Sequence, residues 1–252
     1  MSAEPFSCFM QRALYDPQRG YYTARIRTVG ARGDFSTTAT LSTQLAKAIA
    51  AWLRQEAKAT GVRTIIEVGG GDGSLMHSVL KALGWWQRCC FRVLMVEASP
   101  VLMKQQQDKL KGRVRAWFGT LREALAASEG QALIFSNELL DAFPVDIMQW
   151  DGTAWQEIWH DQGREVMVPL SIRREPFIAL RSPPIKPQRY ELATALHSWL
   201  HDWLPHWQRG AMLTIDYGDE FPALYHRRPR GTLRAYLLQQ RLEGPEVYAN
   251  PG

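Results

Sequence analysis

The sequence predicts an α/β fold, in which a mostly parallel sheet carries helices on both faces. Short apolar runs alternate with stretches of helical periodicity between residues 64 and 215, and a cluster of glycines directly follows the first run. This alternation is typical of βαβ units, whose right-handed crossovers build a doubly wound sheet. The predicted strands are 64–68, 93–96, 114–118, 132–135 and 211–215.

Two helices are expected ahead of the sheet. Apolar residues at helical intervals predict a short helix over 6–14, with Ser7 as the candidate N-cap. The same periodicity predicts a second helix over about 40–58, and we assign residues 1–60 to an N-terminal helical segment. The helices that follow are expected at 74–83, 100–110, 121–127 and 192–207.

Residues 145–187 interrupt the alternation of strands and helices. Asp151 and Gly152 lie between two apolar runs, a pattern that predicts a β-hairpin. A proline-rich stretch at 182–187 then indicates an extended connector. We therefore expect an insertion over the ligand edge of the sheet, inside a core made of 61–144 and 188–252.

Composition limits the class of protein. A chain of 252 residues that is 46% hydrophobic can bury the core of one large domain. Its net charge is +5, but the basic residues are dispersed among acidic ones, which argues against nucleic acid as a partner. Three cysteines make no disulfide framework, and no apolar run is long enough to span a membrane. We expect a cytoplasmic protein without membrane association or a metal site.

The glycine cluster is the strongest candidate for a ligand site. Residues 64–75 lead from an apolar strand through glycines at alternate positions into a helix. Such a turn lets the backbone approach a ligand and exposes the N–H groups of a helix start. A pyrophosphate-binding turn has the spacing G-x-G-x-x-G, whereas Gly69, Gly71 and Gly73 give G-x-G-x-G. The spacing therefore disfavours a dinucleotide.

Two acidic residues favour S-adenosylmethionine as the ligand. Glu97 ends the second predicted strand, where a carboxylate can accept hydrogen bonds from both ribose hydroxyls. Glu67 ends the first strand and would repel a pyrophosphate, but it could attract the ammonium group of a methionine moiety. The predicted cofactor contacts from this part of the chain are Glu67, Gly69, Gly71, Asp72, Gly73 and Glu97.

Polar residues elsewhere are candidates for the acceptor side of the site. Asn137, Glu138 and Asp141 follow the fourth strand, at the sheet edge where α/β proteins bind ligands. Glu138 and Asp141 are three residues apart, so on a helical turn their carboxylates would lie on one face, which suits a cationic acceptor. The alternative is that these residues only cap a helix or are solvated. Asp34 and Thr37 precede the second helix and are of residue types that cap helices.

Taken together, these stretches resemble the MidA family of S-adenosylmethionine-dependent methyltransferases, bacterial relatives of the mitochondrial complex I assembly arginine methyltransferase. The likeness covers almost the whole chain, at 10–22, 33–35, 67–73, 97–100, 137–144, 216–218 and 231–236. It implies a Rossmann-like class I methyltransferase fold with seven strands, S-adenosylmethionine as cofactor and an arginine of a protein substrate as methyl acceptor. It also implies site roles for Asp34, Thr37, Asn137, Glu138, Asp141 and Asp216, with Thr37 on the cofactor side.

The chain departs from the family pattern at two places. Thr37-Thr38-Ala39-Thr40 stands where relatives have Thr-Ser-Pro-Glu, so an acid is missing near the acceptor. Relatives also continue past Pro251-Gly252 with a segment that supplies the last strand, so we expect the core to lack that strand. Two alternatives to an active methyltransferase remain. One is an assembly or scaffold protein that keeps the fold without turnover, and the other is a nicotinamide-dependent oxidoreductase.

Overall fold

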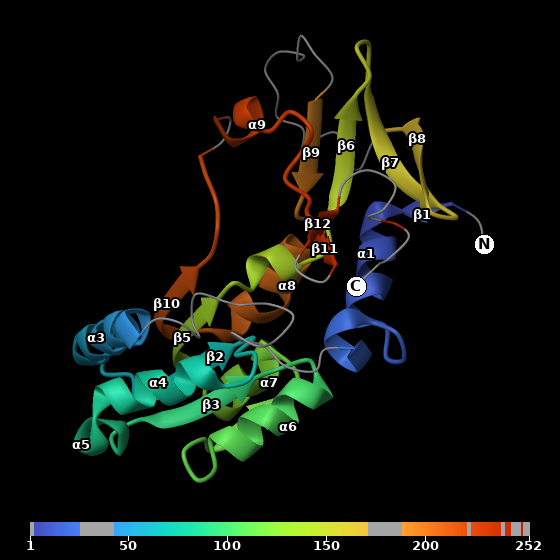
Figure 1. The fold of residues 1–252 in the computed structure, drawn as a ribbon. Helices are drawn as coiled ribbons and strands as arrows, with labels where there is room; N and C mark the ends of the chain where they lie inside the picture. The colour runs from blue at the N-terminus through green and yellow to red at the C-terminus, as the bar shows by residue number, and fades with distance from the viewer. Residues whose placement is uncertain are drawn as a thin grey trace. The chain divides into compact units, whose positions relative to one another are not determined.

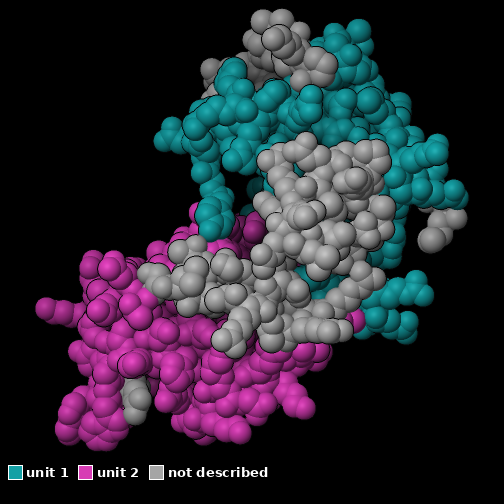
Figure 2. All heavy atoms as spheres, viewed as in Figure 1, with its two compact units in different colours: residues 1–21, 142–198, 217–252 teal, residues 22–141, 199–216 magenta. Residues whose placement is uncertain are grey.

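The computed structural model describes residues 3–25, 43–170, 188–220, 223–237, 240–242 and 248. The chain divides into two compact units, coloured separately in Figure 2. Unit 1 comprises residues 1–21, 142–198 and 217–252, and unit 2 comprises residues 22–141 and 199–216. Each unit is therefore built from segments that are distant in the sequence.

Unit 2 contains the predicted parallel sheet. Its strands are β2 (Thr64–Val68), β3 (Arg92–Val96), β4 (Ala116–Phe118), β5 (Gln131–Asn137) and β10 (Arg209–Ile215), in the spatial order β10-β5-β2-β3-β4. All neighbouring pairs are parallel, which confirms the five predicted strands and the α/β class. From β2 the chain passes to β3 and β4 on one side of the sheet, and then crosses to β5 on the other side of β2. The strand order thus reverses at β2 and β5, and such a switch point opens a ligand crevice at the carboxyl ends of the strands.

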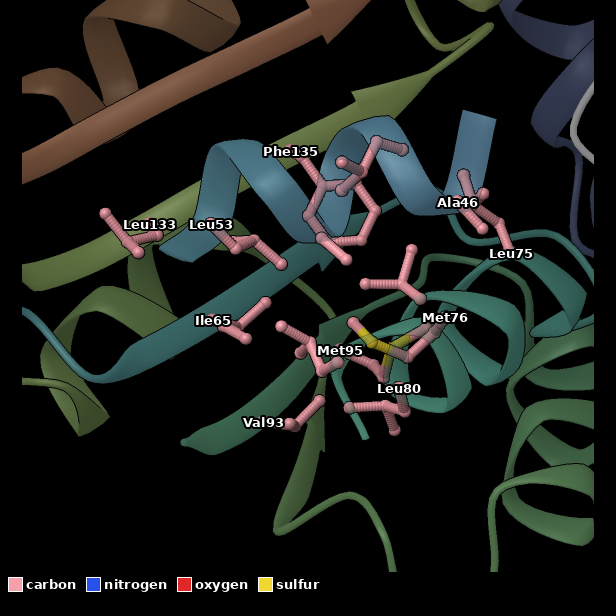
Figure 3. Close-up of a cluster of buried hydrophobic side chains, with 14 of the residues drawn as sticks. Ala46, Leu53, Ile65, Leu75, Met76, Leu80, Val93, Met95, Leu133 and Phe135 are labelled. Carbon is pink, nitrogen blue, oxygen red and sulfur yellow. The ribbon is translucent and has the colours of Figure 1, made fainter. Parts of the chain in front are cut away.

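Helices cover both faces of this sheet. They are α3 (Thr43–Thr60), α4 (Ser74–Leu83), α5 (Trp85–Arg88), α6 (Pro100–Lys109) and α7 (Leu121–Ala127). Successive residues of β2 point to opposite faces, so Ile65 packs among α3 and α4 whereas Ile66 packs with α7 and Trp203. Figure 3 shows the first of these clusters, which brings together Leu53 of α3, Ile65 of β2 and Phe135 of β5. The two buried faces confirm the doubly wound arrangement.

Unit 1 contains an antiparallel sheet. Its strands are β1 (Glu4–Pro5), β6 (Asp146–Trp150), β7 (Trp155–Asp161), β8 (Arg164–Pro169) and β9 (Gln188–Leu192), and all of their pairings are antiparallel. Trp150 pairs with Trp155 across the turn at Asp151, so the predicted hairpin is confirmed. Helix α1 (Phe6–Tyr15) packs on this sheet through Phe6 and Phe9.

Several local features differ from the expectations. Ser7 does not cap α1, because the helix follows Pro5 and the Ser7 hydroxyl donates to Oδ1 of Asp146 at 2.5 Å. Helix α8 (Thr194–Trp203) is shorter than predicted, because Leu192 ends β9 and a 3-10 turn follows at Leu204–His206.

The grouping of the later residues also differs from the predicted boundaries. Residues 188–198 and 217–252 belong to unit 1, whereas the prediction assigned all of 188–252 to the core. Helix α9 (Ala223–Arg227) and a separate antiparallel pair, β11 (Ala235–Leu237) with β12 (Gln240–Leu242), lie in this region. Among the described residues the parallel sheet has five strands rather than the seven that the family resemblance implies.

Candidate functional site

The glycine turn joins the carboxyl end of β2 to the first residue of α4. Gly69 has a φ of +67° and its N–H donates to the carbonyl oxygen of Val96 at 2.9 Å, which holds the turn against β3. Gly73, with a φ of +80°, precedes α4, and a Cβ there would lie 3.3 Å from the Cα of Gln106. Both the left-handed backbone and the close approach of α6 therefore require glycine at this position.

Asp72 has a local role within the turn. Its Oδ1 accepts from the backbone N–H of Ser74 at 2.9 Å, and its Oδ2 forms an ion pair with Lys109 of α6. The structure thus shows Asp72 stabilising the start of α4, while its predicted contact with the cofactor stays a prediction.

Glu67 places a buried carboxyl beside the turn. Its side chain is 1% exposed, and its Oε2 has no hydrogen-bond partner among the described residues. Burial, followed by the charges of Glu97 and Asp72, raises the pKa of Glu67 to about 8. A Cβ on Gly70 would lie 2.9 Å from Oε2, so glycine keeps the space next to this oxygen open. An unpaired buried carboxyl is costly unless a ligand provides a donor or a cation.

Glu97 occupies the carboxyl end of β3 and is held in a fixed orientation. Its Oε1 accepts from the N–H of Ser99 at 2.9 Å, and its Oε2 accepts from Nε2 of Gln106 at 2.9 Å. Burial raises the pKa of Glu97 to about 7, although these hydrogen bonds oppose the shift. Each carboxylate oxygen can accept a second hydrogen bond, so Glu97 retains capacity for two hydroxyl groups.

Gln106 is a site residue that the sequence analysis missed. It is fully buried, and its Nε2 also donates to the carbonyl oxygen of Gly71 at 2.8 Å. Its Oε1 accepts from Nε1 of Trp117 at 3.2 Å. Gln106 therefore connects the glycine turn to Glu97. The signal was available, because Gln106 stands between Leu102 and Leu110 in the buried i, i+4, i+8 stripe of α6.

The acceptor-side residues follow β5. Asn137 ends that strand, and Glu138 has a φ of +50°, with its N–H donating to the carbonyl oxygen of Ile215 at 2.8 Å. A 3-10 turn begins only at Leu140, so the expectation that one helical turn carries both Glu138 and Asp141 is wrong. A left-handed backbone at a residue other than glycine is uncommon and is concentrated at functional sites.

Asp216 supports this segment from β10. Its Oδ2 accepts from the backbone N–H of Leu140 at 2.7 Å, at the first residue of the 3-10 turn. This contact fixes the turn that follows Glu138. Asp216 therefore positions the segment that carries Glu138 and Asp141.

Tyr22 joins the cofactor and acceptor sides of the site. It belongs to a short π-helical segment, Tyr21–Arg25. Burial, and then the negative charges of Asp141, Glu97 and Glu138, raise the pKa of its phenol above the usual range. These electrostatic contacts bring three predicted site residues into one neighbourhood around a tyrosine. The sequence analysis included Tyr22 only in the family motif and gave it no role.

The remaining predictions fall on other parts of the chain or concern metal binding. Asp34 and Thr37 lie outside the described residues. Within the described ranges, no group of three histidine, cysteine or acidic side chains is placed to bind a metal ion. None of the described helices is both long and apolar enough to cross a lipid bilayer.

These features define the class of protein. A parallel sheet with a switch point, a glycine turn of this spacing and a buried acid ending the next strand form the nucleoside site of a class I methyltransferase fold. A family model described as "Putative S-adenosyl-L-methionine-dependent methyltransferase" matches residues 45–252. The chain belongs to this family, of the MidA type that its motifs resemble.

Individual relatives agree with this placement. The chain is 28% identical over 183 residues to the mitochondrial protein arginine methyltransferase NDUFAF7 homolog of Drosophila melanogaster, and 25% identical over 206 residues to human NDUFAF7. These matches cover 62% and 68% of the chain but only 41% and 46% of the relatives, so the chain spans less than half of their length.

Solved structures give the same result. A Burkholderia thailandensis protein described as a "likely methyl transferase", bound to S-adenosyl-homocysteine, superposes with a TM-score of 0.82 at 26% identity. The match covers 99% of this chain and 67% of that one. A native structure of an uncharacterized protein from the same organism superposes with a TM-score of 0.80.

Proposed function

We propose that the chain transfers a methyl group from S-adenosylmethionine to an arginine of a protein. The observation that carries the proposal is a group of acids at the carboxyl edge of the sheet that all act on Tyr22: Glu97 is buried, Glu138 is half-buried and Asp141 is exposed. A site lined by several carboxyls suits cationic ligands. The names of the curated relatives, which are protein arginine methyltransferases, support the same acceptor.

The residues of unit 2 fit the cofactor. Glu97 would accept hydrogen bonds from the two ribose hydroxyls, while Gln106 and Ser99 keep its carboxylate oriented. Glu67, whose Oε2 has no partner in the described part of the chain, would bind the ammonium group of the methionine moiety. When bound, the cofactor supplies an electrophilic methyl group on a sulfonium ion.

The acceptor must lose a proton as it is methylated. A guanidinium is always protonated in proteins and has no free lone pair for attack, so a nearby base has to take a proton from the reacting nitrogen. The freed lone pair would then be available for the methyl group, with the sulfonium sulfur as the leaving group. Tyr22 keeps its proton near neutral pH because its pKa is raised, so the base is a carboxylate. Glu138 and Asp141 are the candidates, and Tyr22 can donate a hydrogen bond that positions one of them.

Two measurements test the proposal separately. Calorimetry with S-adenosyl-homocysteine tests the cofactor, and absence of binding to the wild-type protein would refute it. Incubation with methyl-labelled cofactor and a lysate from cells lacking the protein, followed by mass spectrometry, tests the acceptor. We expect label on arginine, and label found only on another residue type would refute the acceptor. Binding without any transfer would instead support a scaffold protein.

A conservative variant tests the acidic pair. Glu138→Gln keeps the size of the side chain but removes its charge, so turnover should fall by about a hundredfold while affinity for S-adenosyl-homocysteine is unchanged. Glu129→Gln, at an exposed residue that precedes β5, is the matched control and should keep wild-type turnover. Wild-type turnover in Glu138→Gln would show that this carboxylate has no role in catalysis.

A further inference from the structure

The far end of α4 carries a hollow that the cofactor site does not use. It has a volume of about 320 Å³ and is lined by His77, Leu80, Lys81, Gly84, Trp85 and Arg113, all in unit 2. Helix α4 starts at the glycine turn and rises about 1.5 Å per residue, so its last residues lie roughly 15 Å from the turn. Figure 1 shows α5 at this end of α4, beside the amino ends of the strands. The hollow therefore extends from His77, in the first half of α4, toward the edge of the parallel sheet that lies opposite the candidate active site.

Two tryptophans are exposed at this place. Trp85 is 58% exposed and Trp86 is 78% exposed, and their rings meet edge to face with centroids 4.6 Å apart. Arg54 of α3 holds the turn that carries them, because its Nη2 donates to the carbonyl oxygen of Ala82 at 2.7 Å and its Nε donates to Gln87. Large aromatic side chains that are exposed on a fixed turn are typical of interaction surfaces.

The polar part of the lining is cationic. Lys81 and Arg113 are exposed, and neither forms an ion pair within the part of the chain that the structure describes. Nη1 of Arg113 lies 2.9 Å from Nδ1 of His77. Since a guanidinium only donates, Nδ1 accepts and the imidazole proton is on Nε2. Burial, with Arg113 and neighbouring lysines, lowers the pKa of His77, so this ring adds a neutral donor to two fixed positive charges.

We propose that this hollow docks an acidic segment of a partner protein. An apolar side chain of the partner would lie against Trp85, and its carboxylates would pair with Lys81 and Arg113. Charge complementarity supports this occupant, because the described residues that line the hollow offer donors and positive charge but no carboxylate. Two cations around one hollow do not form the stripe that follows a phosphate backbone, and the four residues of α5 are too few for a membrane-binding amphipathic helix.

The location separates this surface from the site of methyl transfer. A protein bound near the end of α4 leaves Glu97 and Glu138 at the carboxyl ends of the strands accessible. The proposal therefore stands whether or not the acceptor is arginine.

A labelled acidic peptide tests the site. The probe is an N-acetylated hexapeptide with four glutamates around a phenylalanine and a leucine, and binding is followed by fluorescence anisotropy at low salt. We expect the analogue with glutamine in place of glutamate to bind at least about tenfold more weakly. Arg113→Glu and Trp85→Ala should each weaken binding of the acidic peptide by about tenfold or more.

Arg115→Glu is the matched control. Arg115 is also exposed and lies two residues further along the same connection, but it does not line the hollow, so this variant should bind the peptide nearly as well as wild type does. Calorimetry with S-adenosyl-homocysteine should give the wild-type affinity for all three variants, which shows that each is folded.

Several results would overturn the proposal. One is equal affinity for the glutamate and glutamine peptides, and another is an equal loss of binding in Arg113→Glu and Arg115→Glu. Tighter binding of a single-stranded RNA or of anionic phospholipid vesicles, lost in Arg113→Glu, would assign the surface to a different class of partner. A dimer that Arg113→Glu dissociates would assign it to a second copy of the chain.

Discussion

The buried carboxyl of Glu67 should make the protein less stable as pH rises. The pKa of Glu67 is about 8 in the folded protein, whereas a solvated glutamate, as in the unfolded chain, has a pKa of 4.5. Between these values the folded state holds a proton that the unfolded state has released. The free energy of unfolding should then fall by up to about 1.4 kcal/mol for each pH unit, and level off above about pH 8. Stability from this group is therefore complete below about pH 4.5 and lost as pH rises through the folded pKa.

Glu67→Gln separates this effect from other titrating groups. The amide keeps the size of the side chain but binds no proton. Between pH 5.5 and pH 7.5 the free energy of unfolding of the variant should therefore fall by about 2 to 3 kcal/mol less than that of the wild type. Urea denaturation at the two pH values measures the difference. Asp108→Asn, which removes an exposed carboxylate on α6, controls for the change in net charge. Equal pH slopes for wild type and Glu67→Gln would refute the assignment of Glu67 as a protonated, unpaired acid.

Three further predictions concern the cofactor side of the site. Glu97→Ala should weaken binding of S-adenosyl-homocysteine by about 2 to 4 kcal/mol, because two charge-assisted hydrogen bonds are lost; unchanged affinity in calorimetry would reject this role. Gln106→Leu should weaken the affinity for S-adenosyl-homocysteine by about tenfold, whereas Gln107→Leu, on the exposed face of α6, should leave that affinity unchanged. Equal affinities of the two variants would show that the orientation of Glu97 is unimportant for binding. Gly73→Ala should destabilise the protein by about 1 to 3 kcal/mol, and by more than Gly84→Ala, which has a similar φ of +79° but no described atom within 4 Å of the added Cβ. Equal losses in denaturation would mean that packing against α6 adds nothing.

The sequence predicted the parallel sheet well because the relevant signals are local. The strands of unit 2 are short apolar runs, and the glycines that follow β2 mark the turn directly. Strand β9 was missed because its polar residues give no such pattern. Its Glu191 is instead satisfied by distant groups, accepting from the N–H of Thr232 at 2.7 Å and the hydroxyl of Tyr225 at 3.0 Å. Long-range contacts of this kind leave no periodic signal in the sequence.

Prediction of the site was similarly limited by tertiary structure. Glu67 and Glu97 follow from their positions at strand ends, but the burial that raises their pKa values does not. Glu138 was expected on a helical turn because its spacing to Asp141 allows it. Its left-handed backbone accompanies a hydrogen bond from its N–H to β10, a long-range contact that the local sequence does not show. Gln106 has the sequence context of a solvent-facing helix residue unless the apolar stripe around it is recognised.

The electrostatics of the site select the class of ligand. Asp72 and Glu97 both act on Glu67, and Glu97 also acts on Tyr22 together with Glu138 and Asp141, so acids extend from the glycine turn to the end of β5. A dinucleotide would place a doubly negative pyrophosphate beside the carboxylate of Asp72 and the protonated carboxyl of Glu67, neither of which would balance its charge. A sulfonium cofactor with an ammonium group, and a guanidinium acceptor on the other side, would neutralise the acids instead. Binding of such cations should ionise Glu67 and release its proton, so the observed binding enthalpy of S-adenosyl-homocysteine, which carries the same ammonium group, should depend on the ionisation enthalpy of the buffer. Identical enthalpies in phosphate and Tris at pH 7 would show that Glu67 does not meet the cationic end of the cofactor.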